Sequence, residues 1–251
     1  MQLLAFDTST DRMSIAVTRT LEGRRMVWEH AGAGGAQASV ALIPSILRLM
    51  GQAGIGFADL DAIVFGCGPG AFTGLRTACA VAQGLGYGAL GGPGGREIPV
   101  LPVDTLLVLA EEARQQLGGG AGTRVLALLD ARMNELYSAP FQFDGACWQR
   151  LAPDRLCGAQ QLEVPLGWQG QEPVLAGNVF DGVGAQLPLS ASWRRIGVLP
   201  TATALLRLAP GLLAAGQAVA PALAWPTYIR DKVAQTSAER AAAKAALPVL
   251  P

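Results

Sequence analysis

The sequence predicts an α/β protein of two lobes, each a mixed sheet flanked by helices. Apolar runs of strand length alternate with longer segments of helical spacing along most of the 251 residues. A buried strand and a hairpin begin the chain, and the same succession begins again at Arg124, directly after the glycine-dense stretch 118–122. Hydrophobic residues make up 51% of the chain and charged ones 15%, a balance typical of a globular protein with a large core.

We expect three regions along the chain. Residues 1–104 are predicted to form an N-terminal lobe that carries partner-binding helices, residues 105–225 a C-terminal lobe, and residues 226–251 a C-terminal strap and tail. The second lobe begins with a helix that the glycines at 118–122 end, and the repeated strand-hairpin pattern follows them.

A predicted helix at 37–53 carries more apolar surface than a helix on one sheet needs. Its apolar residues fall on two neighbouring rows: Leu42, Ile46, Leu49 and Ala53 on one, and Val40, Ile43, Leu47 and Met50 on the other. Pro44 either kinks this helix or begins it. The wide arc fits a helix held between a sheet and a neighbouring helix, or a helix that forms part of a docking face.

The segment 62–88 has the pattern of a strand, a tight turn and a helix. The helix contains Gly74, Gly84, Gly86 and Gly88. Each glycine weakens a helix by about 1 kcal/mol relative to alanine, so we expect this helix to be pressed against a partner. Thr73 is expected to cap its first amides. The turn lacks the lysine of a Walker motif and a dinucleotide fingerprint, which favours a tightly packed structural turn over a phosphate loop.

The other elements follow from two patterns of apolar residues, the apolar runs or alternation typical of strands and the spacing of three to four residues typical of helices. Strands are expected at 2–7, 13–18, 25–30, 98–103, 124–130, 135–143, 147–151 and 174–176, helices at 105–117 and 202–215, and a loop at 91–95. Asp104 is the predicted N-cap of the helix that follows it. The stretch 153–173 has no clear periodicity, and 236–247 is expected to be a frayed helix or a disordered tail.

Composition and motif content exclude several kinds of site. The four cysteines are scattered without metal-ligand spacing, and the single histidine, His30, cannot form a His-x-x-x-His motif. We therefore expect no metal, and thiols that stay reduced. No apolar run is long enough to span a bilayer, and Met1 and Gln2 lead directly into a strand, so we expect a cytoplasmic protein without membrane contact.

The net charge of the chain bears on nucleic-acid partners. Nineteen basic residues balance nineteen acidic ones. A protein that binds tRNA unaided is expected to carry an excess of Lys and Arg, because phosphate neutralisation supplies most of the affinity. We therefore expect any RNA to reach this chain through another protein.

Four stretches resemble the TsaB (YeaZ) family, and they occur in the same order along this chain as in that family. The run from Gly68 to Arg76, Gly-Pro-Gly-Ala-Phe-Thr-Gly-Leu-Arg, is similar to the family signature Gly-Pro-Gly-Ser-Phe-Thr-Gly-Leu-Arg. The stretches 3–10, 129–137 and 226–230 look like the same family, so the resemblance spans the chain almost from end to end. The residues that match the signature and define the motif are Gly68, Pro69, Gly70, Phe72, Thr73, Gly74 and Arg76.

This resemblance implies a fold and a function. The fold would be that of the two-lobe actin-like ATPases (ASKHA superfamily), which is ribonuclease H-like in each lobe. The family is the non-catalytic partner of TsaD in bacterial synthesis of N6-threonylcarbamoyladenosine at position 37 of tRNA, with the ATPase TsaE as a third partner. The resemblance implies a heterodimer with TsaD, or a homodimer through the same face, and contact with tRNA only through the complex. The implied partner interface is Leu42, Ile46, Leu49, Leu75, Ala78, Cys79, Ala82 and Gly86.

The resemblance also implies a vestigial nucleotide site, because the first hairpin of actin-like ATPases surrounds the phosphates of ATP. The corresponding residues are Asp7, Thr8, Ser9, Thr10 and Asp130. An active second lobe needs glycines after its aspartate so that backbone amides approach the phosphate, whereas Ala-Arg-Met-Asn follows Asp130. We therefore expect weak ATP or ADP binding, no required cofactor and no catalysis. The alternative is a small-molecule kinase or ATPase that uses Asp7 and Asp130 beside a metal.

In one place the sequence departs from the family pattern. Related chains often carry a histidine in the first turn of the helix at 37–53, and TsaD uses a pair of histidines there for its metal. Gln37, Ala38 and Ser39 stand at this position, which argues against a TsaD-like catalytic role.

The segment from Trp225 to Arg230 is conspicuously extended and aromatic. In the resembled family it returns toward the first lobe. We expect a packed C-terminal strap here rather than an element that stacks on RNA.

Overall fold

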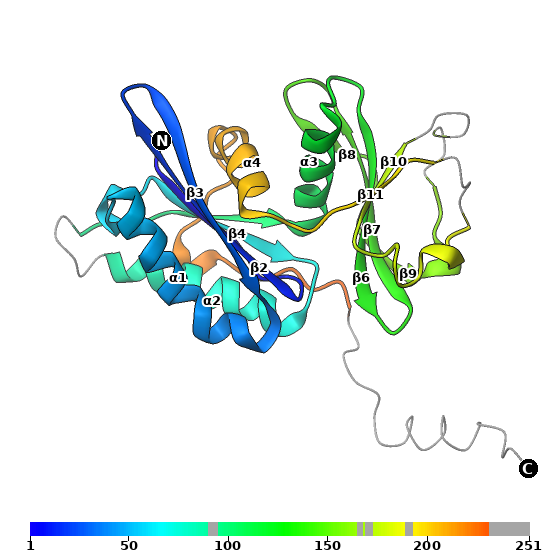
Figure 1. The fold of residues 1–251 in the computed structure, drawn as a ribbon, viewed down its shortest axis with the longest axis horizontal. Coiled ribbons are helices and arrows are strands. Elements are labelled where there is room, and N and C mark those ends of the chain that lie inside the picture. The colour runs from blue at the N-terminus through cyan, green and yellow to red at the C-terminus, as the bar shows by residue number, and fades with distance from the viewer. Residues whose placement is uncertain (90–94, 165–167, 169–172, 189–192, 231–251) are drawn as a thin grey trace, which may run out of the picture.

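The computed structural model describes residues 1–89, 95–164, 168, 173–188 and 193–230. It forms two β-sheets that lie side by side, with helices on the outer face of one sheet and between the two (Figure 1). The predicted loop at 91–95 falls largely outside the described residues, and the frayed helix or disordered tail predicted at 236–247 does so entirely. Among the described residues, no helix is long and apolar enough to cross a membrane.

The first sheet has the strand order β3-β2-β1-β4-β5. Its strands are β1 Leu3–Asp7, β2 Arg12–Leu21, β3 Arg24–Ala33, β4 Ala62–Gly68 and β5 Val100–Asp104. Strands β1, β2 and β3 pair antiparallel, whereas β4 lies parallel to β1 and β5 parallel to β4. Every residue of β1 and β4 is buried, because helices cover both faces of these central parallel strands.

The second sheet repeats this arrangement, which confirms the repeat predicted from the sequence. Its strands are β6 Arg124–Arg132, β7 Glu135–Phe143, β8 Trp148–Arg150, β9 Arg155–Gly158, β10 Val174–Gly177 and β11 Arg195–Gly197. Strands β6, β7 and β8 pair antiparallel, and β10 lies parallel to β6 as β4 does to β1. Strand β9, which pairs with β7, lies in the stretch 153–173 and is too short to show a periodicity of its own.

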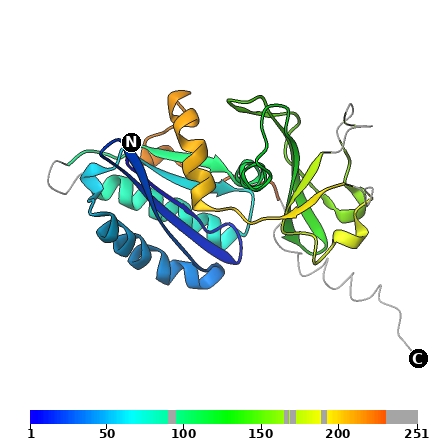
Figure 2. The same cartoon turned by 45° about the horizontal axis from the view of Figure 1, so that its top comes forward.

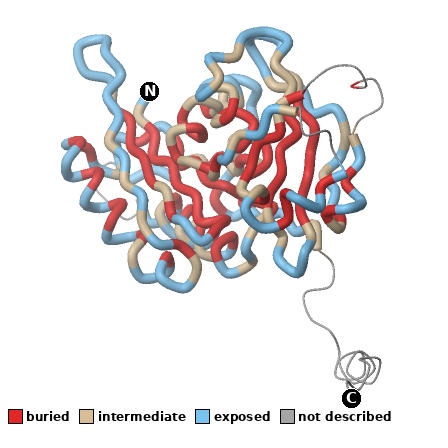
Figure 3. Tube along the Cα trace, turned by 45° about the vertical axis from the view of Figure 1, so that its right-hand side comes forward, coloured by how far each residue is buried: buried red, intermediate tan, exposed pale blue. Residues whose placement is uncertain are grey.

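Two helices cover the outer face of the first sheet: α1 Ala38–Ala53 and α2 Phe72–Gly88 (Figure 1). Helix α1 continues through Pro44. Leu42 and Ala82, one from each helix, lie in the same core cluster as Phe6 of β1. The exposure colouring shows buried residues concentrated in the two sheets and exposed residues recurring along the helices (Figure 3).

Two further helices, α3 Thr105–Leu117 and α4 Ala202–Ala214, lie between the sheets (Figure 2). Asp104 caps α3 as predicted, since its carboxylate accepts a hydrogen bond from Leu107 N at 2.9 Å. Helix α3 packs on the second sheet, whereas α4 packs on the first. Helix α4 therefore joins the first sheet although it falls in the predicted 105–225 lobe, because the chain crosses back after β11.

The short 3-10 helices among the described residues are Gly35–Gln37, Phe57–Asp59, Ala159–Gln161, Gly184–Gln186 and Pro221–Leu223.

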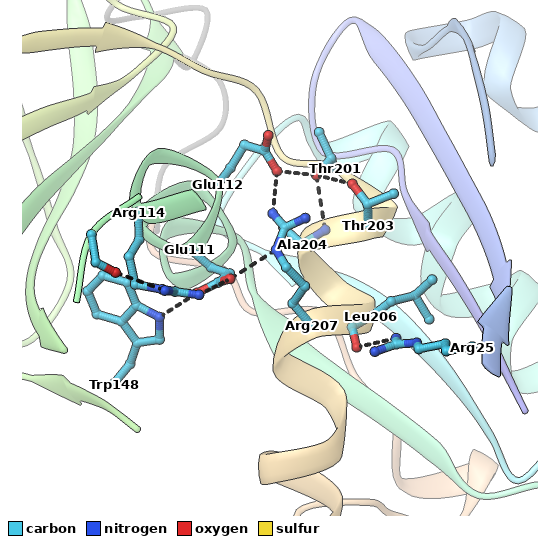
Figure 4. Close-up of polar contacts among 11 residues, drawn as sticks. Arg25, Glu111, Glu112, Arg114, Trp148, Thr201, Thr203, Ala204, Leu206 and Arg207 are labelled. Carbon is cyan, nitrogen blue, oxygen red and sulfur yellow. Dashed lines mark hydrogen bonds and ion pairs between the residues drawn. The ribbon is translucent and has the colours of Figure 1, made fainter. Parts of the chain in front are cut away.

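A buried carboxylate joins the two lobes where α3 meets α4 (Figure 4). The oxygens of Glu111, which is 2% exposed, accept two hydrogen bonds from Arg114 at 2.9 Å. They also accept one from Trp148 Nε1 at 3.0 Å and one from Arg207 Nε at 2.9 Å. Arg207 comes from α4 and donates a second bond to Glu112 at 2.6 Å. Desolvation alone would raise the pKa of Glu111, but the bonds from its partners outweigh it and hold the pKa below its ordinary value.

Candidate functional site

The glycine-rich motif at 68–76 packs against the first hairpin turn of the same chain. Thr8 Oγ1 donates a hydrogen bond to Gly74 O at 2.7 Å, and Ala71 N donates one to Ser9 O at 2.7 Å. A Cβ added at Gly74 would lie 1.8 Å from Thr8 O, and one added at Gly70 would lie 2.6 Å from Ser9 O. These two glycines are therefore required for the close approach of the two segments, and the structural-turn interpretation of this motif fits the contacts.

The prediction that Thr73 caps α2 is wrong. The N-cap is Ala71, and no side chain caps the helix. Because the helix begins at Phe72, Thr73 is already its second helical residue, and its carbonyl accepts a hydrogen bond from Thr77 Oγ1 at 2.9 Å.

A cavity of about 250 Å³ lies between the lobes, beside the motif. Its lining includes Ser9, Thr10, Gly70, Asp130, Arg132 and Asn178. The structure thus brings together three of the five residues predicted for a vestigial nucleotide site: Ser9, Thr10 and Asp130. Asp7 and Thr8 do not line this cavity, and both are 0% exposed.

Asp7 is buried at the carboxyl end of β1. Its Oδ1 accepts hydrogen bonds from Ser9 N at 2.9 Å and from Ser9 Oγ at 2.7 Å, whereas Oδ2 has no partner among the described residues. Oδ2 instead occupies the space that a Cβ on Gly66 would fill, since the two would be 1.8 Å apart. Burial raises the pKa of Asp7 to about 6. Asp7 thus lies in the chain interior, outside the lining of the cavity.

The turn between β6 and β7 replaces a glycine-rich phosphate turn with side-chain-bearing residues. Arg132, Met133 and Asn134 have φ of 65°, 57° and 59°, the left-handed region that favours glycine. Arg132 lines the cavity, and Met133 is 73% exposed. The second lobe therefore presents side chains, rather than a run of glycine amides, to the cavity.

The eight residues predicted as the partner interface are all buried in their own chain, and this prediction needs correcting. Leu42, Ile46, Ala78 and Ala82 are 0% exposed, Leu75, Leu49 and Cys79 are 1%, 2% and 5% exposed, and Gly86 is buried as well. The reason is physical: the strongest apolar row of a helix that covers a sheet faces the sheet, so helical periodicity identifies the inward face. A partner can contact only the opposite side of these helices.

That opposite side includes exposed apolar and small residues, which we call the outer face: Val40, Ile43 and Leu47 of α1, with Ala80, Gly84 and Gly88 of α2. The three α1 residues are 78%, 43% and 52% exposed. A Cβ added at Gly84 or Gly88 would meet nothing within 4 Å. The second apolar row of the helix at 37–53 was the sequence signal for this face, and the predicted interface omitted it.

Three comparisons with known proteins agree with this architecture. The family model "TsaD: tRNA N6-adenosine threonylcarbamoyltransferase" matches residues 33–238. The "tRNA threonylcarbamoyladenosine biosynthesis protein TsaB" of Escherichia coli (strain K12) is 30% identical over 247 residues, which cover 93% of this chain and 96% of that protein. The solved structure "YeaZ from Pseudomonas aeruginosa" has a TM-score of 0.78 at 33% identity and covers 91% of this chain and 99% of that one. The chain therefore has the two-lobe actin-like fold and belongs to the TsaB (YeaZ) family.

Proposed function

We propose that this chain is the non-catalytic subunit that binds and activates TsaD in the synthesis of N6-threonylcarbamoyladenosine at position 37 of tRNA. The observation that carries the proposal is the outer face, an exposed surface of apolar and small residues on two neighbouring helices. Exposed apolar patches on a folded protein mark interaction sites. The family name, which concerns threonylcarbamoyladenosine biosynthesis, supports TsaD as the partner.

The glycines of α2 support a partner that approaches closely. Gly74 faces Thr8 and Gly86 faces Pro221, so contacts inside the chain account for these two. An added Cβ at Gly84 or Gly88 would meet no described residue within 4 Å, although each glycine weakens the helix by about 1 kcal/mol relative to alanine. A second helix whose backbone lies against this bare surface would supply the missing contacts, because small residues bring helix axes closer than the usual separation.

The outer helices also lack negative charge. Helices α1 and α2 contain no aspartate or glutamate, and Arg48 and Arg76 are their charged residues. Depletion of charge is typical of the buried core of a protein interface. A homodimer through the same face would use the same surface and compete with TsaD.

We propose no chemistry for the chain itself. Asp7 is enclosed behind the hairpin turn, and the turn at Arg132 carries side chains where an ATPase needs backbone amides, so both support an accessory role rather than a kinase or ATPase. The role requires no cofactor, and we propose that the interlobe cavity binds ATP or ADP at most weakly. TsaE is the proposed third partner, tRNA reaches the chain through the complex, and the cytoplasm is the proposed location.

Gly84→Leu tests the docking surface. The variant should lose co-purification with TsaD while the chain stays folded, because the new side chain enters open space in the chain and the contact region in the complex. Gly211→Leu on α4 is the matched control, since a Cβ there also meets nothing within 4 Å. Ala82→Leu is unsuitable because Ala82 is 0% exposed.

Light scattering with and without TsaD separates the outcomes. The wild-type chain and Gly211→Leu should each give the mass of a complex, and Gly84→Leu the mass of the free chain. An unchanged complex with Gly84→Leu would count against the outer face as the docking surface. Turnover of ATP by the isolated chain at an enzymatic rate would contradict the accessory role.

A further inference from the structure

The strap, residues 224–230, lies against α2 through its backbone and small side chains. Ala224 O accepts hydrogen bonds from Cys79 Sγ at 3.3 Å and Gln83 Nε2 at 2.9 Å. Thr227 N donates to Cys67 O at 2.7 Å, at the end of β4. Arg230 then reaches the second lobe, where it donates to Ala131 O at 2.9 Å. The predicted packing of this strap is therefore correct for its backbone.

Both aromatic side chains of the strap keep a large exposed fraction. Trp225 is 69% exposed and Tyr228 is 45% exposed. The Tyr228 ring lies against Phe72 of α2, with centroids 4.9 Å apart. The guanidinium of Arg76 lies 3.8 Å above the Phe72 ring, and Arg76 Nε donates to the Tyr228 hydroxyl at 3.2 Å. We call these three residues, together with the exposed Trp225 three positions earlier in the strap, the aromatic ledge: Phe72, Arg76, Tyr228 and Trp225.

The ledge carries one positive charge, at Arg76, and the first acidic residue after the strap is Asp231. Neither α2 nor the strap contains an aspartate or glutamate. Among the described residues no carboxylate forms an ion pair with Arg76, whereas Arg230 is paired with Glu135. Within the described residues, the ledge thus offers two partly exposed aromatic rings and one guanidinium stacked on Phe72, with no carboxylate paired to it.

We propose that the aromatic ledge binds a single-stranded segment of RNA, with bases stacked on Trp225 and Tyr228 and a phosphate at Arg76. Exposed aromatic rings beside an arginine are the elements of sequence-tolerant binding to single strands, since every base has a π-face. The inference rests on the proposed function, in which the RNA is the tRNA held by the complex. The neutral charge of the chain agrees with a local contact that adds to the affinity of a larger assembly.

The test measures the affinity of the complex with TsaD for unmodified tRNA, by anisotropy of labelled tRNA over a range of salt concentrations. Trp225→Ala and Tyr228→Ala should each weaken binding about tenfold, because each removes a stacking platform. Arg76→Gln should weaken binding and lower the slope of log affinity against log salt by about 1 in magnitude, the signature of one phosphate contact. Tyr228→Phe should keep most of the affinity because it keeps the ring. Arg24→Gln, an exposed arginine on β3, is the control and should leave affinity unchanged.

The mass of each complex, from light scattering, is measured in parallel. Wild-type affinity for tRNA in intact complexes of Trp225→Ala and Tyr228→Ala would overturn the proposal. Loss of TsaD from these two variants would also overturn it, because the ledge would then be a protein contact.

Ultraviolet crosslinking of the isolated chain to single-stranded oligouridine at low salt tests the ledge without TsaD. Crosslinks on the peptide that contains Trp225 and Tyr228 are expected, and crosslinks elsewhere alone, or none, would reject the proposal. Failure of the wild-type chain to bind TsaD, with crosslinks on the strap, would contradict the proposed function and leave the ledge supported.

Discussion

The two helical layers on the first sheet use their side chains in opposite ways. On the inner side, α4 meets α3, and Glu111, Glu112, Arg114 and Arg207 satisfy one another within the chain. On the outer side, α1 and α2 have no carboxylate and expose Val40 and other apolar or small residues. The chain thus completes the inner layer with its own ion pairs, whereas no described element covers the outer layer.

The difference shows how a two-lobe fold can serve as a binding subunit. Ion pairs between α3 and α4 join the lobes, so the sheet that carries α1 and α2 has a defined position relative to the second lobe. An outer face held on such a support loses less conformational entropy when a partner binds, since less of it must be ordered on contact.

The largest effect is expected from Glu111→Ala at the inner layer. It leaves two guanidinium groups and the Trp148 indole N–H without their common acceptor, and loss of one partner from a buried ion pair destabilises by about 3–5 kcal/mol. Urea unfolding measures the change. Glu163→Ala is the matched control, because Glu163 pairs with Arg155 at the surface and should cost less than about 1 kcal/mol. Equal effects of the two substitutions would remove the distinction between a buried and an exposed pair.

The pH dependence of stability distinguishes the two buried carboxylates. Asp7 has a pKa of about 6 in the folded chain against an ordinary 3.8, so between these values the native state holds a proton that the unfolded state has released. Its contribution to the free energy of unfolding is therefore greatest below about pH 4 and falls by about 3 kcal/mol as pH rises through 6.

Asp7→Asn tests this contribution directly. Asn keeps an acceptor for the Ser9 bonds but does not titrate, so the variant should lose this decline between acidic and neutral pH. Urea midpoints of wild type and variant, compared at about pH 4.5 and pH 7.5, measure the difference. The same decline in both proteins would show that Asp7 does not titrate in this range. The contribution of Glu111 to stability depends on pH in the opposite direction. Because its pKa is lowered in the folded chain, this contribution is present at neutral pH and is lost as pH falls below the ordinary pKa of a glutamate.

Gly74→Ala tests the side of α2 that faces its own chain. The added Cβ would lie 1.8 Å from Thr8 O, so one of the two segments must move. Overpacking of a buried site costs about 1–3 kcal/mol, measured by the shift in urea midpoint. Stability equal to wild type would mean that the turn at Thr8 yields freely.

The smallest effect is expected from Gly84→Ala, on the side that faces away. The Cβ enters open space, so the helix gains about 1 kcal/mol from the better propensity of alanine. Thermal unfolding should show a higher midpoint than wild type. A destabilised Gly84→Ala would indicate that the surface is already covered within the chain, and the comparison between the two sides of α2 would fail.

Much of the fold could be predicted because its signals are local. The buried strands, the N-cap at Asp104 and the helix at 202–215 each follow from the pattern of a few neighbouring residues. The repeat of the strand-hairpin start predicted the second sheet. The four-residue strand β9 was missed because so short a segment has no measurable period.

The candidate site was predicted less well, because it depends on which side of a helix is covered. The sequence shows two apolar rows on the helix at 37–53, and the stronger row, with Leu42 and Ile46, was assigned to the partner although it faces the sheet. Likewise the sequence predicts that α2 lies against a partner but not which glycines face it: Gly74 and Gly86 face their own chain, whereas Gly84 and Gly88 face open space among the described residues.

The sequence by itself determined the succession of elements, the family motif, the neutral charge and the presence of excess apolar surface on the outer helices, because periodicity and composition act over short distances. The tertiary structure alone decided that Asp7 is enclosed, that Arg207 crosses to Glu111, and that Trp225 and Tyr228 remain exposed. The physical reason is that burial and pairing are set by segments far apart in the chain, and a residue type does not say what lies against it.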